Sequence, residues 1–140
     1  MSTTISAKGQ CLCGSVQVEA NTLDTQMEAC HCSMCRRWGG GPLLAINCQQ
    51  DVALSGEQHI TTYSSSDWAE RGFCKSCGTH LFYRLKHNNQ YIMPAGLFEL
   101  PDTLSFHQQI FIDEKPDYYC FANNTKEMTG AEVFAQYAPQ

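Results

Sequence analysis

The sequence predicts a mostly β protein, and three observations support this prediction. Apolar and polar residues alternate with a period of two in several short runs. Turn residues separate these runs at the spacing of an antiparallel β protein, and helical periods of useful length are scarce. The chain has 140 residues, of which 43% are hydrophobic, so we expect one domain over residues 1–140 that builds its own core.

The predicted strands follow one another along the chain. The segment "SVQVEA" places Val16, Val18 and Ala20 on one face, and four further segments are rich in apolar, aromatic or branched residues. These four predicted strands cover residues 42–47, 79–85, 89–96 and 104–112. The turn signals lie at residues 54–57, 86–89 and 100–103. Short helical turns are predicted in "CSMCRRWG" (32–39) and "TGAEVFAQYA" (129–138).

Composition and charge restrict the class of protein. The N-terminus has no apolar run of signal-peptide length, and no stretch is apolar enough to span a membrane, so we expect a cytoplasmic protein without a membrane partner. The formal net charge of −5 argues against nucleic acid as a partner. Nine cysteines without a secretion signal indicate metal binding more than disulfides.

Four of the cysteines form two short pairs, each followed by a glycine. The pairs are Cys11 with Cys13 and Cys74 with Cys77, and the glycines are Gly14 and Gly78. A thiolate knuckle folds the backbone tightly round a metal, and glycine accepts the positive φ that this can demand. Four sulfurs predict a closed, structural metal site, with zinc favoured over iron.

A second group of three cysteines lies within six residues. Cys30, Cys32 and Cys35 form C-x-C-x-x-C, one sulfur short of a closed site. A non-protein ligand could take the fourth position, or a protein side chain could complete the site; the candidates are Cys48, Cys120, His31 and His80. Cys48 and Cys120 are better interpreted as small buried hydrophobes, and the histidines as packed residues. An open position would let zinc bind a substrate atom, and three thiolates suit sulfur chemistry.

The residues after this cluster fit an anionic ligand. Arg36 and Arg37 could offer forked donors to a carboxylate, and Gly39, Gly40 and Gly41 would let a ligand approach backbone N–H groups. An arginine pair is also common on a solvated surface, and a glycine run in a plain turn.

At this level of detail the sequence resembles a known family. The segments "GQCLCGSV", "CHCSMCRRWGG" and "FCKSCGTHLFYR", in that order, are similar to the glutathione-dependent formaldehyde-activating enzymes, a family that includes centromere protein V. The later "FHQQIFIDEKPDYYCF" resembles the closing segment of that family, so the match runs from about Gly9 to about Phe121. The resemblance implies a β-tent of two small antiparallel sheets with two zinc sites. By motif position, Cys11, Cys13, Cys74 and Cys77 correspond to the structural ligands and Cys30, Cys32 and Cys35 to the catalytic ones.

The resemblance also implies an activity. The family joins glutathione and formaldehyde reversibly to S-hydroxymethylglutathione, so we expect a zinc-dependent carbon–sulfur lyase whose partner is glutathione or a similar small thiol. The alternative is a non-catalytic, zinc-stabilised binding module. Nucleobase deamination at a zinc is disfavoured, because the H-x-E and P-C-x-x-C elements are absent from the sequence.

Overall fold

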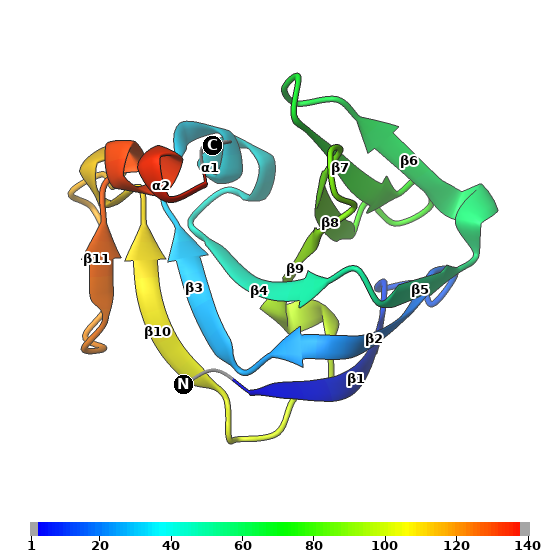
Figure 1. Ribbon diagram of the computed structural model, residues 1–140. Helices are drawn as coiled ribbons and strands as arrows, with labels where there is room; N and C mark the ends of the chain where they lie inside the picture. The colour runs from blue at the N-terminus through cyan, green and yellow to red at the C-terminus, as the bar shows by residue number, and fades with distance from the viewer. Residues whose placement is uncertain (1–2, 138–140) are drawn as a thin grey trace.

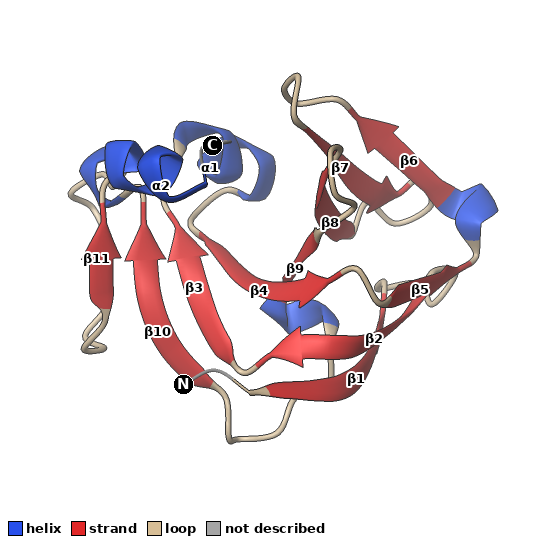
Figure 2. Ribbon diagram, in the orientation of Figure 1, coloured by secondary structure: helices blue, strands red, loops and turns tan. Residues whose placement is uncertain are grey.

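The protein folds into two β-sheets with two short helices at one end, as the computed structural model of residues 3–137 shows (Figures 1 and 2). The predicted mostly β class with two sheets is confirmed. In Figure 1 the larger sheet bends, so that β11, β10 and β3 lie on one side and β8, β7 and β6 on the other, with β4 between them.

The smaller sheet has three antiparallel strands in the order β1 (Thr4–Gln10), β2 (Gln17–Asp24) and β5 (Val52–Ser55). Along β2, the predicted alternation holds: Val18 and Ala20 are buried, whereas Glu19 between them is exposed. One face of this sheet therefore covers the core, and the other faces solvent.

The larger sheet has eight strands in the order β11-β10-β3-β4-β9-β8-β7-β6. The strands are β3 (Gln26–Cys30), β4 (Leu43–Gln49), β6 (Ile60–Tyr63), β7 (Ala69–Cys74), β8 (His80–Leu85), β9 (Tyr91–Pro94), β10 (Ser105–Ile110) and β11 (Lys126–Met128). All neighbours are antiparallel except that β10 runs parallel to both β3 and β11. The connection from β9 passes β1 at a Gly9–Phe98 bridge and so reaches β10 at the end where β3 begins. This long crossover makes the parallel pairing possible.

The two helices sit beyond the ends of β3, β10 and β11 (Figure 2). Helix α1 (Ser33–Gly39) follows β3 directly, and α2 (Gly130–Tyr137) follows β11. Both were predicted, although Ala138 of the second predicted segment lies outside the described residues. Three 3-10 turns complete the structure: η1 (Glu57–His59), η2 (Ala95–Leu97) and η3 (Ile112–Glu114). Within residues 3–137, neither helix has the length and apolar character needed to cross a bilayer.

The five predicted strands correspond to β2, β4, β8, β9 and β10. The prediction missed six others: β1, β3, β5, β6, β7 and β11. Several of these place cysteine, arginine or small residues at buried positions, so their apolar alternation is weak; β7, "AERGFC", is an example.

The main core lies between the smaller sheet and the middle of the larger one. It contains Leu23 of β2, Ile46 of β4, Leu81 of β8 and Met93 of β9, all fully buried. Cys30, Cys32 and Cys35 form a separate small buried cluster beside α1, against which the partly buried Leu43, Ile110 and Phe111 pack. The fold thus places one cysteine group away from the main core, near the helical end.

Candidate metal centres

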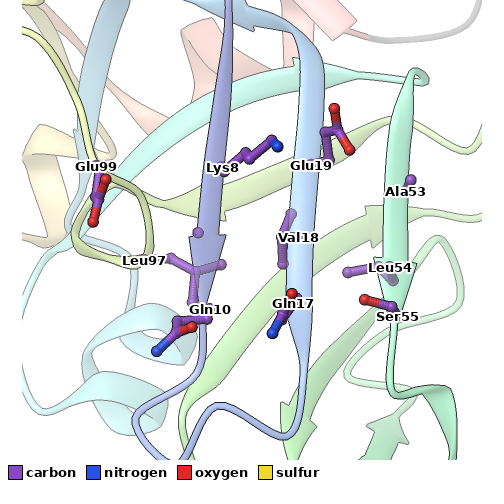
Figure 3. A pocket seen from close by; sticks show the side chains of 11 residues that line it. Lys8, Gln10, Gln17, Val18, Glu19, Ala53, Leu54, Ser55, Leu97 and Glu99 are labelled. Atoms are coloured by element: carbon purple, nitrogen blue, oxygen red, sulfur yellow. The ribbon is translucent and has the colours of Figure 1, made fainter.

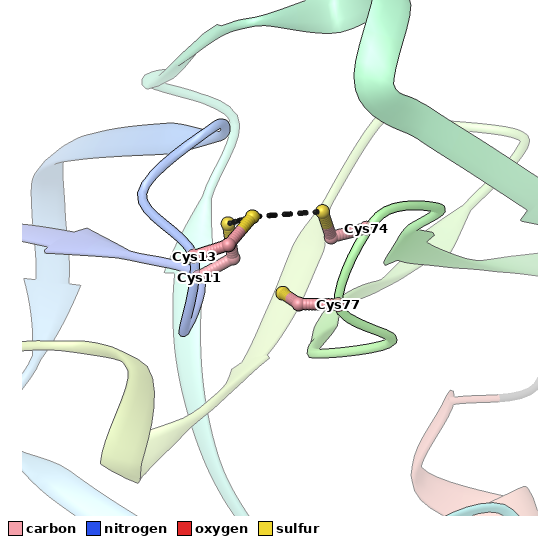
Figure 4. A group of neighbouring side chains, drawn as sticks. All are labelled: Cys11, Cys13, Cys74 and Cys77. Carbon is pink, nitrogen blue, oxygen red and sulfur yellow. Dashed lines mark hydrogen bonds between the residues drawn. The ribbon is translucent and has the colours of Figure 1, made fainter.

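The first cluster consists of Cys11, Cys13, Cys74 and Cys77. Their four sulfur atoms all lie within 4.8 Å of one another. Cys11 and Cys13 come from the loop after β1, whereas Cys74 ends β7 and Cys77 lies in the turn before β8, so the two pairs face each other (Figure 4). Four converging sulfurs fit a tetrahedral thiolate site and leave no position for a substrate.

The two knuckles have the backbone that the sequence predicted. Gly14 has φ 79° and Gly78 has φ 78°, a left-handed conformation that glycine adopts without penalty. The Val16 N–H donates to the Cys11 sulfur at 3.3 Å. The hydroxyl of Thr79 lies 3.2 Å from the Cys77 sulfur and accepts a hydrogen bond from the Leu12 N–H at 3.0 Å. Thr79 therefore fastens one knuckle to the other.

The second cluster consists of Cys30, Cys32 and Cys35, whose sulfur atoms also lie within 4.8 Å of one another. Cys30 ends β3, Cys32 is the N-cap of α1, and Cys35 lies within that helix. The Cys32 sulfur accepts the Cys35 N–H at 3.3 Å, so a candidate metal ligand also caps the helix. All three cysteines are buried, and Phe111 packs against them.

The three sulfurs of the second cluster affect one another's ionisation. The neighbouring Cys30 and Cys35 thiols hold the pKa of Cys32 well below its usual value. The neighbouring Cys32 and Cys35 sulfurs raise the pKa of Cys30. Three converging sulfurs are a suitable donor set for a soft or borderline cation such as zinc.

Within the part of the chain that the structure describes, no fourth histidine, cysteine or acidic side chain joins the second cluster. Cys48 is fully buried in the main core, as predicted for a small hydrophobe. Cys120 was predicted to be buried too, but it is exposed because it lies in a loop outside both sheets.

His31 is fully buried and uses both ring nitrogens within the protein. Nε2 lies 2.8 Å from Gln109 Oε1, and Nδ1 lies 2.8 Å from the Tyr119 hydroxyl. The amide oxygen of Gln109 can only accept, so this network places the proton on Nε2. Burial lowers the pKa of His31 and keeps the ring neutral. His31 is a packed residue, and the second cluster remains a three-sulfur site.

The arginines and glycines that follow the second cluster, which the sequence indicated as candidates for ligand binding, lie in different environments. Arg36 donates from Nε to the His31 carbonyl at 2.9 Å, whereas Arg37 is exposed. Gly39 and Gly40 are exposed, and Gly40, with φ 87°, ends α1 by donating to the Arg36 carbonyl. Gly40 therefore has a conformational role in the helix, and ligand binding by this segment stays a prediction.

One arginine that the sequence did not single out lies directly at the second cluster. Arg71 of β7 is 3% exposed, and its two terminal guanidinium nitrogens lie 3.6 and 3.7 Å from the Cys35 sulfur. Its guanidinium also lies over the Trp38 ring at 4.9 Å and over the Tyr83 ring at 5.0 Å. Strand β7 thus contributes to both clusters, Cys74 to the first and Arg71 to the second.

Aromatic side chains surround the second cluster. Trp38 stacks on His80 with the ring centroids 3.8 Å apart, and Trp68 donates to the Tyr83 hydroxyl at 3.2 Å. Phe134 of α2 contacts Trp68 edge-on, and it contacts Phe111 in the same way. These pairs join the two sides of the bent sheet around the three cysteines.

A shallow depression lies elsewhere, over the solvent face of the smaller sheet (Figure 3). It has a volume of about 480 Å³ and is lined by β1, β2, β5 and the segment after β9. Lys8, Glu19 and Glu99 mix both charges along it, and no cysteine lines it. This depression is therefore separate from both cysteine clusters.

Comparison with known proteins gives one consistent result. The chain is 39% identical over 127 residues to an uncharacterized lyase of Schizosaccharomyces pombe, a match that covers 90% of this chain and 93% of that protein. It is 30% identical over 126 residues to a Halomonas elongata protein provisionally named as a glutathione-dependent formaldehyde-activating enzyme, covering 79% of this chain and 78% of that one.

A solved structure and a family match complete the comparison. A crystal structure of a Rhodobacter sphaeroides protein superimposes with a TM-score of 0.56 at 27% identity, covering 68% of this chain and 90% of that chain. Residues 6–114 match the family described as "Glutathione-dependent formaldehyde-activating enzyme", a stretch that contains every cysteine of both clusters. The chain belongs to the glutathione-dependent formaldehyde-activating enzyme family.

Proposed function

We propose that this protein is a zinc-dependent carbon–sulfur lyase that acts on adducts of glutathione or a similar small thiol, such as S-hydroxymethylglutathione. The observation that carries the proposal is the second cluster, in which three buried sulfurs converge and no fourth protein ligand of the described residues joins them. Family membership and a relative named as a lyase support the same class of reaction.

The proposal assigns different roles to the two clusters. Cys11, Cys13, Cys74 and Cys77 would hold a structural zinc, and Cys30, Cys32 and Cys35 would hold a catalytic one. A zinc ion with three protein ligands supplies a Lewis acid with an exchangeable position, which favours the thiolate form of a bound thiol. Arg37, which is exposed two residues after Cys35, would attract the carboxylates of glutathione.

The reaction forms and breaks one carbon–sulfur bond. In the forming direction the thiol sulfur attacks the carbonyl carbon of formaldehyde, the C=O electron pair moves to oxygen, and that oxygen takes up the proton that the thiol released. In the lyase direction the hydroxyl loses its proton, the C–S bond breaks, and the thiol regains the proton. The Tyr119–His31–Gln109 network is already internally satisfied, so we assign it a supporting role beside the site.

Native mass spectrometry with and without glutathione tests this function, together with the rate at which formaldehyde and glutathione equilibrate. We expect two zinc ions per chain, one glutathione adduct and faster equilibration. The Cys32→Ser variant should keep one zinc and lose both the adduct and the acceleration. Two firmly bound zinc ions with neither adduct nor acceleration would contradict the enzyme and favour a zinc-stabilised binding module.

A further inference from the structure

Arg71 is a buried cation, and no carboxylate among residues 3–137 forms an ion pair with it. It is 3% exposed, and among the described residues the ion pair joins a different arginine, Arg84, to Glu70 at 2.8 Å. Burying an unpaired charge is strongly unfavourable, so buried arginines are normally matched by an anion. The group that Arg71 faces is the sulfur of Cys35.

The surroundings hold the guanidinium in one orientation. Trp38 and Tyr83 each lie about 5 Å from it, and its Nε donates to the Ser65 hydroxyl at 3.3 Å. Both terminal nitrogens remain directed to the Cys35 sulfur. Aromatic faces stabilise a guanidinium without competing for its N–H donors. The fork is therefore fixed toward a single acceptor.

Charge counting indicates what this contact does. A divalent zinc ion with three thiolates carries one net negative charge, which disfavours an anionic fourth ligand. One adjacent guanidinium cancels that charge, and its hydrogen bonds withdraw electron density from the sulfur, so the metal becomes a stronger acceptor.

We infer that Arg71 is a positioning residue of the second cluster: it donates to the Cys35 sulfur and neutralises the three-thiolate site, so that a thiolate substrate can occupy the fourth position. This inference rests on the proposed function. It identifies the ligand class as anionic, because a neutral ligand would not need the compensating charge.

Cobalt substitution tests this inference by a spectroscopic readout as well as by activity. In the Co²⁺-loaded protein, sulfur-to-cobalt charge-transfer bands report the electron density on the thiolates. Subtracting the spectrum of the Cys32→Ser variant removes the contribution of the first cluster. We expect Arg71→Met to move the remaining band to longer wavelength and to weaken glutathione binding about 10- to 100-fold, as is typical of outer-shell partners. Arg71→Lys keeps the charge but not the forked guanidinium. Its band position and its glutathione affinity should lie between those of the wild type and those of Arg71→Met.

Arg84→Gln is the matched control, because it removes an arginine from the adjacent strand without touching either cluster. It should leave the band and the glutathione affinity unchanged. An unshifted band in Arg71→Met would overturn the inference; if that variant does not fold, an unshifted band in Arg71→Lys would do so.

The proposed function can fail separately. A wild-type protein that binds a second cobalt but does not respond to glutathione would refute the function, and the band shift would still decide the role of Arg71. A wild type that responds to glutathione, with Arg71→Met responding equally, would refute the role of Arg71 alone.

Discussion

The two cysteine clusters differ in how the chain builds them. The first cluster joins segments 61 residues apart, from the loop after β1 and the turn after β7, and one of its cysteines, Cys13, is exposed. The second cluster comes from one short segment at the end of β3, and all three of its cysteines are buried. A site that ties distant segments together contributes to folding, whereas a local, sheltered site with one ligand fewer leaves room for chemistry.

Their surroundings differ in the same sense. Neutral backbone and hydroxyl groups such as the Val16 N–H and the Thr79 hydroxyl surround the first cluster. A guanidinium and aromatic rings surround the second. A closed thiolate site needs only enough hydrogen bonds to orient its ligands, but an open one must also manage the charge of an incoming ligand.

The largest effect is expected from a substitution that removes a ligand of the first cluster. Cys74→Ser should remove the structural metal and with it most of the free energy of unfolding, which for a domain of this size is about 5–15 kcal/mol. Thermal unfolding followed by circular dichroism, with zinc counted by native mass spectrometry, measures this loss. Cys120→Ser is the control, because its exposed thiol should change stability by less than about 0.5 kcal/mol. Equal stability of the two variants would contradict a structural role for this cluster.

The second effect removes function but not the fold. Serine is a good N-cap, so Cys32→Ser keeps the cap of α1 and changes only the metal ligand. We expect one zinc fewer per chain, loss of the catalysed equilibration, and a melting temperature close to that of the wild type. A large fall in melting temperature would show that the second cluster, like the first, mainly supports folding.

A smaller effect is expected from the exposed Arg37, in contrast to the buried Arg71. Because Arg37 is exposed, Arg37→Ala should weaken glutathione binding only about two- to fivefold, as expected for a surface ion pair. Binding of the uncharged thiol 2-mercaptoethanol should not change. Isothermal titration with both thiols measures the difference, and an equal loss for both would exclude carboxylate recognition by Arg37.

Another modest effect concerns the cover of the second cluster. Thr129 and Glu132 form a reciprocal capping box at the start of α2, with N–H···O distances of 3.0 and 3.2 Å. Thr129→Ala should destabilise α2 by about 0.5–2 kcal/mol and expose Phe111 and the cysteines beneath it. In metal-free protein, alkylation of the second cluster should become faster while that of the first stays the same. Unchanged alkylation at both clusters would mean that α2 does not shield the site.

The same cap gives a pH dependence with a defined sign. Hydrogen bonds to the Thr129 backbone and side chain lower the pKa of Glu132 below its ordinary value of 4.5. The contribution of this carboxylate is therefore complete above pH 4.5 and is lost as the pH falls through the lowered, folded-state pKa. The stability difference between wild type and Glu132→Gln should be present at pH 7 and should shrink in acid, as denaturant titrations would show.

The sequence predicted the parts of the fold whose patterns are local. Strands with regular alternation, such as β2, were recognisable, and so was the turn at residues 86–89, whereas the turn predicted at 54–57 begins inside β5. The end of β3 was not, because its buried positions hold Ala29 and Cys30 in succession. The parallel placement of β10 depends on a long crossover, which no local pattern encodes.

The candidate site divides in the same way. Cysteine spacing located both clusters, because metal ligands recur at characteristic separations. Arg71 was missed because it lies three residues before Cys74 and 36 residues after Cys35, so the sequence associates it with the first cluster. One signal could have revealed Arg71. It lies two residues after Ala69, on the same buried face of the strand, and an arginine on a buried face needs an anionic partner.

Strand β7 has a consequence for how the protein acquires its metals. It ends in Cys74 and carries Arg71 three residues earlier, and an odd separation places the two side chains on opposite faces of the strand. A metal bound at the first cluster would fix the end of β7, and with it the strand that holds the guanidinium beside the second cluster. We therefore expect an ordered loading in which the scaffold metal enters first and the reactive one second. Under zinc limitation, such a protein would consist of empty, scaffold-loaded and fully loaded molecules, with few that carry the reactive ion alone.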